Sequence, residues 1–446
     1  MPFSSYMMIG LMLFALFFGA GNLIFPAELG QAAGTNVTLA TIGFLITGVG
    51  LPFLGILAIG FSGNDGLQQL AGKIHPLYGI IFTATLYLTI GPFFAAPRTG
   101  AVAFDMAMKP FLSESQVLIG SIVFTLLFFG GTLLLSLNPS KIVDRIGKYL
   151  SPAIIILLVF LLSAVVIKPM GTIGAPQSAY MNGELFTGFT AGYNTMDALA
   201  SLVFGIIVIK AIRSMGVTSK KGILMATMKT GAVATFFLAL LYAGIAYLGA
   251  VSTEKLGLLE TGGQVLTRTA TYYFGTLGFI LLAAVMILAC LTTAIGLMTA
   301  CGEYFHQLFP KISYKAFVTF FTTFCFVVAN VGLANIIVFS MPLLMFIYPL
   351  AISLMILAFC APLFKDAKII YIVTTITVFF ISVIDGLKTL CTTLEIELFS
   401  WLHPIVTVYE NYLPLYTDGL GWLLPFVMVL LVMTLFVRAF GTKTTA

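Results

Sequence analysis

The chain has 446 residues, of which 60% are hydrophobic and only 8% are charged, and its mean hydropathy is +1.10. Soluble domains carry about 25% charged residues, so this composition excludes a soluble globular protein and predicts a polytopic protein in a lipid bilayer. The net charge of +5 belongs to the loops of such a protein and does not indicate binding to nucleic acid. The five cysteines lack metal-binding spacing and four fall in predicted spans, so we expect neither disulfides nor a metal cluster.

The first apolar segment, residues 8–30, lacks the charged start and the cleavage site of a signal peptide, so we expect it to be the first span. Its middle reads GAGN at residues 19–22, and Pro26 follows. Glycine costs about 1 kcal/mol and proline about 3 kcal/mol in a helix interior, so we predict that the helix unwinds near residues 19–22. Unwound backbone at membrane depth lines a cavity and can bind a small charged ligand and an ion. A plain kink, formed by small residues packing between helices, is the alternative.

A spanning helix needs about 20 largely apolar residues, and on that rule the sequence predicts twelve spans. They are residues 8–30, 37–61, 76–97, 115–137, 149–167, 187–212, 222–250, 276–302, 314–330, 335–363, 367–386 and 420–440.

The Lys and Arg residues of the predicted loops set the orientation. With a cytoplasmic N-terminus, fifteen of them fall on the cytoplasmic side and six on the other side, so we expect both termini in the cytoplasm. Residues 63–75 fit a short helix on the cytoplasmic surface or an ordinary solvated loop. We predict that the long outer connection over residues 251–275 forms a helical lid, with an ordinary loop as the alternative.

The sixth span repeats the interruption of the first. Gly188, Gly192 and Asn194 fall early in it, so we predict a second break near residues 190–196. The first and sixth spans cross in opposite directions, which is the pattern of an inverted five-plus-five repeat. The predicted parts are the first repeat over residues 1–167, the second repeat over residues 168–363, and two peripheral helices with a cytoplasmic C-terminus over residues 364–446.

Asp197 is the one carboxylate that the prediction places well within a span. A charged group at membrane depth is costly and is a functional candidate by default. It could pair with an ion, accept a proton or cap a half-helix. We expect the capping role, because a carboxylate is favoured at the N-terminus of a helix that begins after a break.

The eighth span contains two adjacent threonines. The carbonyl of Ala289 and the hydroxyls of Thr292 and Thr293 share one helix face at positions i, i+3 and i+4. Threonine hydroxyls in membrane helices usually bond to the carbonyl three or four residues back. Alternatively, these three neutral oxygens form half of a cage for a small hard cation, and carbonyls of the unwound first span supply the rest.

Several segments resemble the branched-chain amino acid:cation symporter family (BrnQ type). They are FALFFGAGNLIFPAELGQAAG, GPFFAAPRTGAVAF, GYNTMDALASLVFG, GGQVLTRTATYYFG and the helix with Thr292 and Thr293. The resemblance runs from the first span to about the tenth. It implies an all-α membrane protein with the LeuT-like fold, twelve helices as a five-plus-five inverted repeat plus two. It also implies Na⁺- or H⁺-driven uptake of leucine, isoleucine and valine across a bacterial inner membrane.

The resemblance also implies residue roles. LeuT-type symporters bind Na⁺ through oxygens that match those of Ala15, Phe18, Ala289, Thr292 and Thr293. Backbone N–H groups at the first break would hold the substrate carboxylate, and carbonyls at the second break would hold its amino group. Some relatives place a further cation ligand at the position of Asn22. The implied substrate-binding residues are Phe18, Gly19, Ala20, Gly21, Asn22, Tyr193, Asn194, Thr195 and Met196.

A secondary transporter accounts for the broken helices, the span count and the charge bias together. A channel would need a continuous polar path or a ring motif, and an enzyme would need clustered His, Cys or carboxylate side chains. The sequence also lacks a P-loop. We therefore predict a symporter without a cofactor, coupled to Na⁺ because neutral oxygens carry no proton in the physiological range. Coupling to H⁺ through Asp197 is the alternative, and oligomeric state and preference among the three amino acids stay open.

Overall fold

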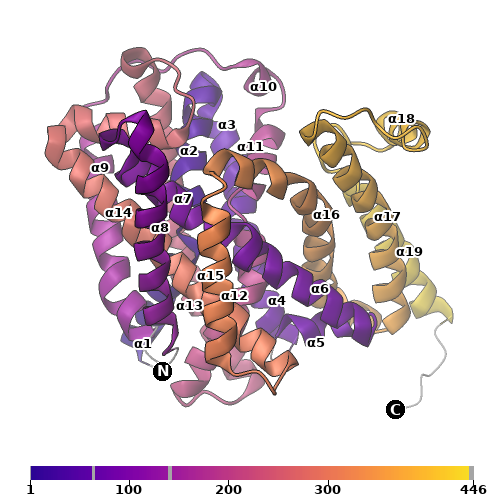
Figure 1. The fold of residues 1–446 in the computed structure, drawn as a ribbon. Helices are drawn as coiled ribbons and strands as arrows, with labels where there is room; N and C mark the ends of the chain where they lie inside the picture. Colours follow the sequence, from indigo (N-terminus) through magenta and orange to yellow (C-terminus); the bar gives the residue numbers. More distant parts are fainter. Residues whose placement is uncertain (1, 63–65, 139–142, 441–446) are drawn as a thin grey trace. The chain divides into compact units, whose positions relative to one another are not determined.

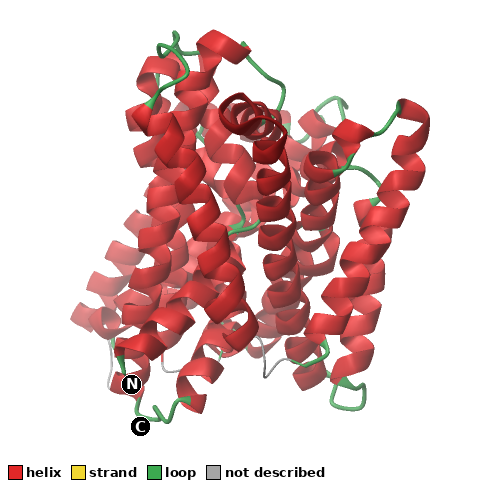
Figure 2. Ribbon diagram, turned by 90° about the vertical axis from the view of Figure 1, so that its left-hand side faces the viewer, coloured by secondary structure: helices red, strands yellow, loops and turns green. Residues whose placement is uncertain are grey.

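The computed structural model describes residues 2–62, 66–138 and 143–440. Over these residues the chain consists of helices joined by loops and turns, without a strand (Figures 1 and 2). It divides into two compact units, Met1–Ile56 with Tyr87–Ile336, and Leu57–Leu86 with Ile337–Ala446. The first unit contains both of the helices that the sequence predicts to be interrupted.

The helices of the first unit follow from long apolar segments separated by glycine, proline and polar residues. They are α1 (Phe3–Phe17), α2 (Ala20–Ala33), α3 (Val37–Leu45), α7 (Ala95–Ala107), α8 (Glu114–Ser136), α9 (Ser151–Ile167), α10 (Ser178–Met181), α11 (Glu184–Tyr193), α12 (Asp197–Ser214), α13 (Lys220–Leu256), α14 (Gly262–Leu308) and α15 (Tyr314–Ala329). The second unit holds α5 (Leu67–Gly72), α17 (Lys368–Thr393), α18 (His403–Tyr412) and α19 (Leu423–Phe440). Three helices run from one unit into the other along the chain: α4 (Leu51–Ser62), α6 (Pro76–Leu88) and α16 (Leu333–Cys360).

Among the described residues, eight helices are long and apolar enough to cross a membrane. The pair α11 and α12, bent by 42° at its break, makes a ninth, and three shorter apolar helices are Phe3–Phe17, Tyr314–Ala329 and Leu423–Ala439. Ala20–Ser62 counts as one helix of 43 residues, although the sequence assigns it to two spans. The total of twelve therefore stays a prediction.

The third predicted span does not end at residue 97. Helix α6 ends at Leu88, the next five residues form a π-helical turn with a non-helical Gly91 (φ −82°, ψ −116°), and α7 continues to Ala107. Pro97 lies in the first turn of α7, where its missing N–H has no helical partner to lose. The predicted boundary was wrong for this reason, and the correction places Arg98 inside a buried helix.

Both segments predicted as structured loops contain helices. Residues 63–65 lie outside the described part of the chain, and α5 covers Leu67–Gly72 of the first segment. In the second segment α13 continues to Leu256, and α14 begins at Gly262 and bends at Gly275. The positive φ of 58° at Gly275 is a conformation that glycine adopts without steric cost. A role for either helix as a lid or on the cytoplasmic surface stays a prediction.

Helix α2 packs closely against α13. Gly30 faces the backbone of α13, and a Cβ atom there would overlap the carbonyl oxygen of Ala246. Gly249 faces α2 in return, where a Cβ atom would overlap the carbonyl oxygen of Ala27. The two helices thus approach through reciprocal glycines, as membrane helices with small interface residues do.

Helices α11 and α3 repeat this arrangement. A Cβ atom on Gly188 would overlap the carbonyl oxygen of Ala40, and one on Gly43 would overlap that of Leu185. The helix after the first break therefore packs on α13, and the helix before the second break packs on α3. Each pair joins one interrupted helix to the helix that follows the other interrupted helix. The contact that corresponds to α11 with α3 in an inverted repeat is that of α1 with α13, and these two helices also pack together.

Candidate functional site

The first break consists of two residues, Phe18 and Gly19, between α1 and α2. The N–H of Phe18 still donates to the carbonyl of Phe14 at 2.7 Å, but the N–H of Gly19 donates instead to Oδ1 of Asn22 at 3.0 Å. Asn22 is the third residue of α2, and its side chain therefore caps this helix. The break was predicted at residues 19–22; it begins one residue earlier and ends at Gly19.

Helix α2 continues through Pro26, which the sequence treats as a helix breaker. A proline within a helix has no N–H for the carbonyl four residues earlier, and here that carbonyl belongs to Asn22. The carbonyl of Asn22 and the unwound residues before α2 thus lie within one turn of each other. The break concentrates backbone polar groups that the helix itself does not satisfy.

The end of α1 also leaves the carbonyl of Ala15 without its usual helical donor, because the N–H of Gly19 points to Asn22. Two hydroxyls of α14 take that place: Thr292 Oγ1 donates to Ala15 O at 2.9 Å, and Thr293 Oγ1 does so at 3.4 Å. Thr292 Oγ1 also lies 2.9 Å from the carbonyl oxygen of Ala289. Four of the five predicted cation ligands thus converge.

Phe18 is the fifth predicted ligand. Its ring is buried and stacks on Phe14 and Tyr242, with centroid distances of 5.0 and 6.2 Å. Among the described residues, the hydroxyl hydrogen bonds of Thr292 and Thr293 go to Ala15 and Ala289 and none reaches the carbonyl of Phe18. The role of Phe18 as a ligand stays a prediction.

Gly19 lets α14 approach the break. A Cβ atom on Gly19 would lie 2.9 Å from Thr293 Oγ1 and 3.2 Å from its methyl carbon. Both distances are too short for ordinary van der Waals contact, so a larger residue would displace the side chain of Thr293 from its place beside Ala15. The glycine is therefore required by the close approach between helices, whereas its φ of −110° is open to any residue.

The second break comprises three residues between α11 and α12. Met196 has a left-handed backbone (φ 63°), which costs a non-glycine residue about 1–3 kcal/mol and is common at functional sites. Thr195 supports the turn, since its hydroxyl donates to Gly192 O at 2.9 Å and accepts from Asp197 N at 3.3 Å. The predicted break near residues 190–196 lies at residues 194–196.

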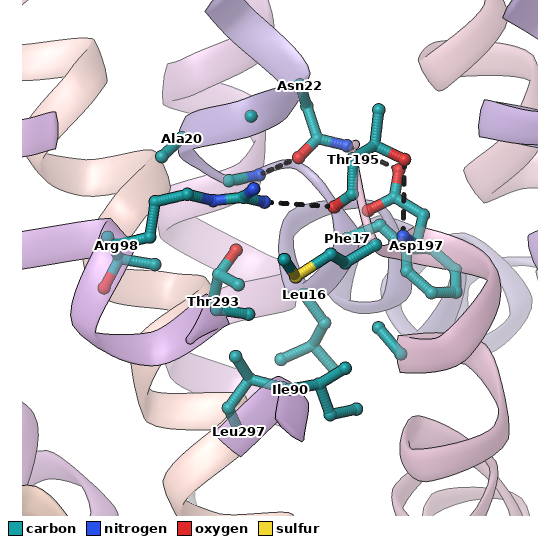
Figure 3. Close-up of a pocket in the computed structure, with 16 residues that line it drawn as sticks. Leu16, Phe17, Ala20, Asn22, Ile90, Arg98, Thr195, Asp197, Thr293 and Leu297 are labelled. Carbon is teal, nitrogen blue, oxygen red and sulfur yellow. Dashed lines mark hydrogen bonds between the residues drawn. The ribbon is translucent and has the colours of Figure 1, made fainter. Parts of the chain in front are cut away.

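Arg98 reaches this break from α7, and no role was predicted for it from the sequence. One guanidinium nitrogen donates to the carbonyl of Asn194 at 3.0 Å and another to that of Thr195 at 3.4 Å, as Figure 3 shows for Thr195. The guanidinium also lies 5.5 Å from the ring centre of Phe25, a cation–π distance. Arg98 is only 5% exposed. The signal was present as an arginine within an apolar motif, but the wrong span boundary at residue 97 assigned it to a loop.

Asp197 joins the two breaks. Its Oδ2 accepts a hydrogen bond from Asn22 Nδ2 of α2 and another, at 2.8 Å, from the hydroxyl of Tyr242 of α13. Asn22 also contacts the hydroxyl of Tyr242. Asp197 lies in the first turn of α12, as expected, but the expected capping hydrogen bond was wrong: Met196 is the N-cap residue, and the carboxylate bonds to side chains of two other helices. Tyr242 was missed, because a single tyrosine in an apolar span carries no local signal of such a contact.

Residues of α1, α2, α7, α12, α14, the π-helical turn and both breaks line a small cavity (Figure 3). Small-molecule sites combine apolar walls with a few polar groups. Here the apolar part includes Leu16, Phe17, Ile90 and Leu297, and the two ionisable lining residues are Arg98 and Asp197. Of the predicted site residues, those that line the cavity are Gly19, Ala20, Gly21, Asn22, Thr195, Met196 and Thr293.

Three predicted substrate-binding residues do not line the cavity. Phe18 packs into the aromatic stack of the first break, and Asn194 presents its carbonyl to Arg98. Tyr193 is buried at the end of α11, where its ring meets that of Phe189 edge-on at 5.6 Å. The aromatic and backbone contacts of these residues shape the breaks and not the cavity wall.

The family described as "Branched-chain amino acid transport protein" matches residues 3–440 of the chain. The chain belongs to this family. Its relatives include the branched-chain amino acid permease BrnQ of Bacillus subtilis, 48% identical over 422 residues that cover 95% of this chain and 94% of the relative. The branched-chain amino acid transport system 2 carrier protein of Pseudomonas aeruginosa is 40% identical, with 97% and 96% covered.

Two solved transporters share the fold at low sequence identity. One is Mhp1, a nucleobase-cation-symport-1 family transporter, in a closed conformation (TM-score 0.56, 13% identity, 89% of this chain and 94% of that one). The other is MhsT in complex with L-phenylalanine (TM-score 0.56, 15% identity, 96% and 98%). The predictions of an all-α LeuT-like fold and of a multi-pass transporter that is not an enzyme are confirmed.

Proposed function

We propose that this protein is a secondary active transporter that carries leucine, isoleucine and valine into a bacterial cell across the inner membrane, with both termini in the cytoplasm. The main observation that supports this proposal is the cavity between the two helix breaks, which has a positive group, a negative group and apolar walls. A zwitterion with an apolar side chain matches all three features. The names of the relatives support branched-chain amino acids within that class.

The repeat architecture is part of the proposal. Residues 1–167 and 168–363 form the inverted repeats, and the helices after them are peripheral; residues 441–446 lie outside the described residues. The contacts of α1 with α13 and of α11 with α3, which are equivalent under this division, support it. In such folds, repeats that move against each other open the central site to each side in turn.

The cavity should select by side-chain size. Burial of each CH₂ group contributes about 0.8 kcal/mol, and leucine has three more carbons than alanine. We expect leucine to compete for uptake of labelled leucine more than about tenfold better than alanine. Equal competition by alanine would contradict an apolar pocket, whereas glycine serves as a control that should compete more weakly than either.

Na⁺ is the proposed coupling ion, bound by the oxygens of Ala15, Phe18, Ala289, Thr292 and Thr293. Two observations support this site: the carbonyl of Ala15 lacks its usual helical donor, and the hydroxyls of Thr292 and Thr293 both reach it. One charge entering the cell gains about 2.3 kcal/mol per 100 mV, and a tenfold Na⁺ gradient adds about 1.4 kcal/mol. Together, about 3.7 kcal/mol would support a several-hundredfold gradient of leucine.

A proton is the second candidate, favoured by one observation. Asp197 is a carboxylate that lines the cavity and accepts hydrogen bonds from Asn22 of α2 and Tyr242 of α13. Its protonation would change the contacts with Asn22 and Tyr242 and so bias the arrangement of α2 and α12. No titrating group occurs among the five proposed Na⁺ ligands, so the two candidates use different residues.

Uptake of labelled leucine into proteoliposomes separates these candidates. We expect an inward Na⁺ gradient at constant pH to drive accumulation above equilibrium, and a pH gradient without Na⁺ to drive little. Accumulation driven by the pH gradient alone would assign coupling to H⁺. Counterflow of labelled leucine against preloaded unlabelled leucine should occur with either ion, and its absence would contradict a carrier.

A further inference from the structure

The carbonyl groups at the second break already have a cationic partner. In the sequence-based assignment, these carbonyls hold the ammonium of the substrate. In the structure, the guanidinium of Arg98 donates to the carbonyls of Asn194 and Thr195 at 3.0 and 3.4 Å. A second cation at the same oxygens would meet the charge of Arg98. The substrate ammonium therefore needs a different partner in this cavity, one with a negative charge.

Asp197 provides that partner. It is 2% exposed and lines the cavity. The hydrogen bonds from Asn22 and Tyr242 both reach Oδ2, and neither uses Oδ1. A carboxylate fixed by two donors on one oxygen is oriented to accept a charge-assisted hydrogen bond on the other.

Arg98 and α2 together provide the opposite charge. A Cβ atom on Gly21 would lie 3.0 Å from a terminal guanidinium nitrogen of Arg98, so the guanidinium lies against the first turn of α2. A helix N-terminus carries a partial positive charge and directs N–H groups outward. Arginine binds carboxylates through two parallel hydrogen bonds, and the ring of Phe25 lies against the guanidinium within the cation–π range.

We propose that Arg98, with the N-terminus of α2, binds the α-carboxylate of the substrate and that Asp197 binds its α-ammonium. This inference rests on the proposed function and specifies how the amino acid is recognised. One positive and one negative side chain reach the same cavity from α7 and α12 (Figure 3). The pair matches the two charges of a zwitterion, so neither charge is buried without a partner.

The first experiment uses the unmodified protein and three probes of similar shape. Leucine has both charges, leucinamide lacks the carboxylate, and 4-methylpentanoate lacks the ammonium. Apparent dissociation constants come from ligand-induced thermal stabilisation of the purified protein in the presence of Na⁺. Leucine should bind at least about tenfold more tightly than either analogue, because hydrogen bonds to charged groups are the strong ones. Equal binding of leucinamide and leucine would overturn the role of Arg98.

Two variants assign the charges to residues. Arg98→Gln should weaken leucine binding at least about tenfold and leave leucinamide within about threefold, so that the preference between them is lost. Asp197→Asn should likewise weaken leucine binding at least about tenfold and leave the binding of 4-methylpentanoate within about threefold, so that the preference for leucine is lost. Arg98→Lys keeps the positive charge but loses the two parallel hydrogen bonds of a guanidinium, and it should recover part of the preference for leucine over leucinamide. A purely structural role for Arg98 would weaken all probes equally.

The control is Arg213→Gln, an exposed position about 24 Å along α12 from Asp197. It should bind all probes as the unmodified protein does. If Arg98→Gln does not fold, Arg98→Lys and the analogue series on the unmodified protein decide the question. Full preference for leucine over leucinamide in a folded Arg98→Gln variant would overturn the inference. Absence of any leucine binding to the unmodified protein would instead contradict the proposed function.

Discussion

Replacing Thr292 and Thr293 together by valine is expected to raise the Na⁺ concentration for half-maximal leucine uptake about tenfold or more. Valine has nearly the shape of threonine, so the change removes two oxygen atoms and little volume. Both hydroxyls lie at the carbonyl of Ala15, and that of Thr292 also lies at Ala289. Loss of two neutral oxygens from a cation cage removes ligands that a hard cation needs. The measurement is leucine uptake into proteoliposomes over a range of Na⁺ concentrations.

The double change Thr227→Val and Thr230→Val is the matched control. These threonines are also buried and bond to carbonyls of their own helix, Ile223 and Ala226, at 2.9 Å each. They lie on α13 and their hydroxyls do not reach the first break, so Na⁺ dependence should stay the same. Unchanged Na⁺ dependence in the Thr292 and Thr293 variant would place the coupling ion elsewhere, and Asp197 would become the leading candidate for proton coupling.

Sequence reasoning located both breaks because their signals are local. Glycine and asparagine in the middle of an apolar segment have no role in a plain spanning helix, and the threonine pair lies on one face by helix geometry alone. Sequence reasoning placed the start of the first break one residue late and its end three residues late. The reason is that Asn22 caps α2 through the N–H of Gly19, and hydropathy does not show which side chain a backbone group will choose.

Arg98 and Tyr242 could not be found in this way. Arg98 acts on carbonyls 96 and 97 positions away, and Tyr242 on a carboxylate 45 positions away. Such contacts depend on how the helices pack, and the sequence neighbours of the two residues do not identify their partners. The Pro97 boundary error added to this, because an arginine just after a predicted span is normally a loop residue. Reading Pro97 as a first-turn proline would have kept Arg98 within the membrane.

Gly30→Ala is expected to lower the thermal stability of the protein clearly and to reduce leucine uptake about tenfold or more. The added methyl would overlap the carbonyl oxygen of Ala246 and lie 2.9 Å from the N atom of Ala250. Both are backbone atoms within α13, so no side chain can rotate away and the two helices must separate. Overpacking costs about 1–3 kcal/mol where side chains can adjust, and a rigid backbone contact lies at or above that range. Thermal unfolding of the purified protein measures the loss.

Gly130→Ala is the matched control for this close approach. Gly130 also lies within a helix, α8, but a Cβ atom there meets nothing within 4 Å. Alanine is favoured over glycine in a helix by about 1 kcal/mol, so this variant should unfold at the same or a higher temperature and keep its uptake. Gly188→Ala, which would overlap the carbonyl oxygen of Ala40 on α3, should behave like Gly30→Ala because it too meets backbone atoms of the neighbouring helix. If Gly30→Ala and Gly188→Ala were as stable as Gly130→Ala, the reciprocal glycine contacts would not hold the interrupted helices against α13 and α3.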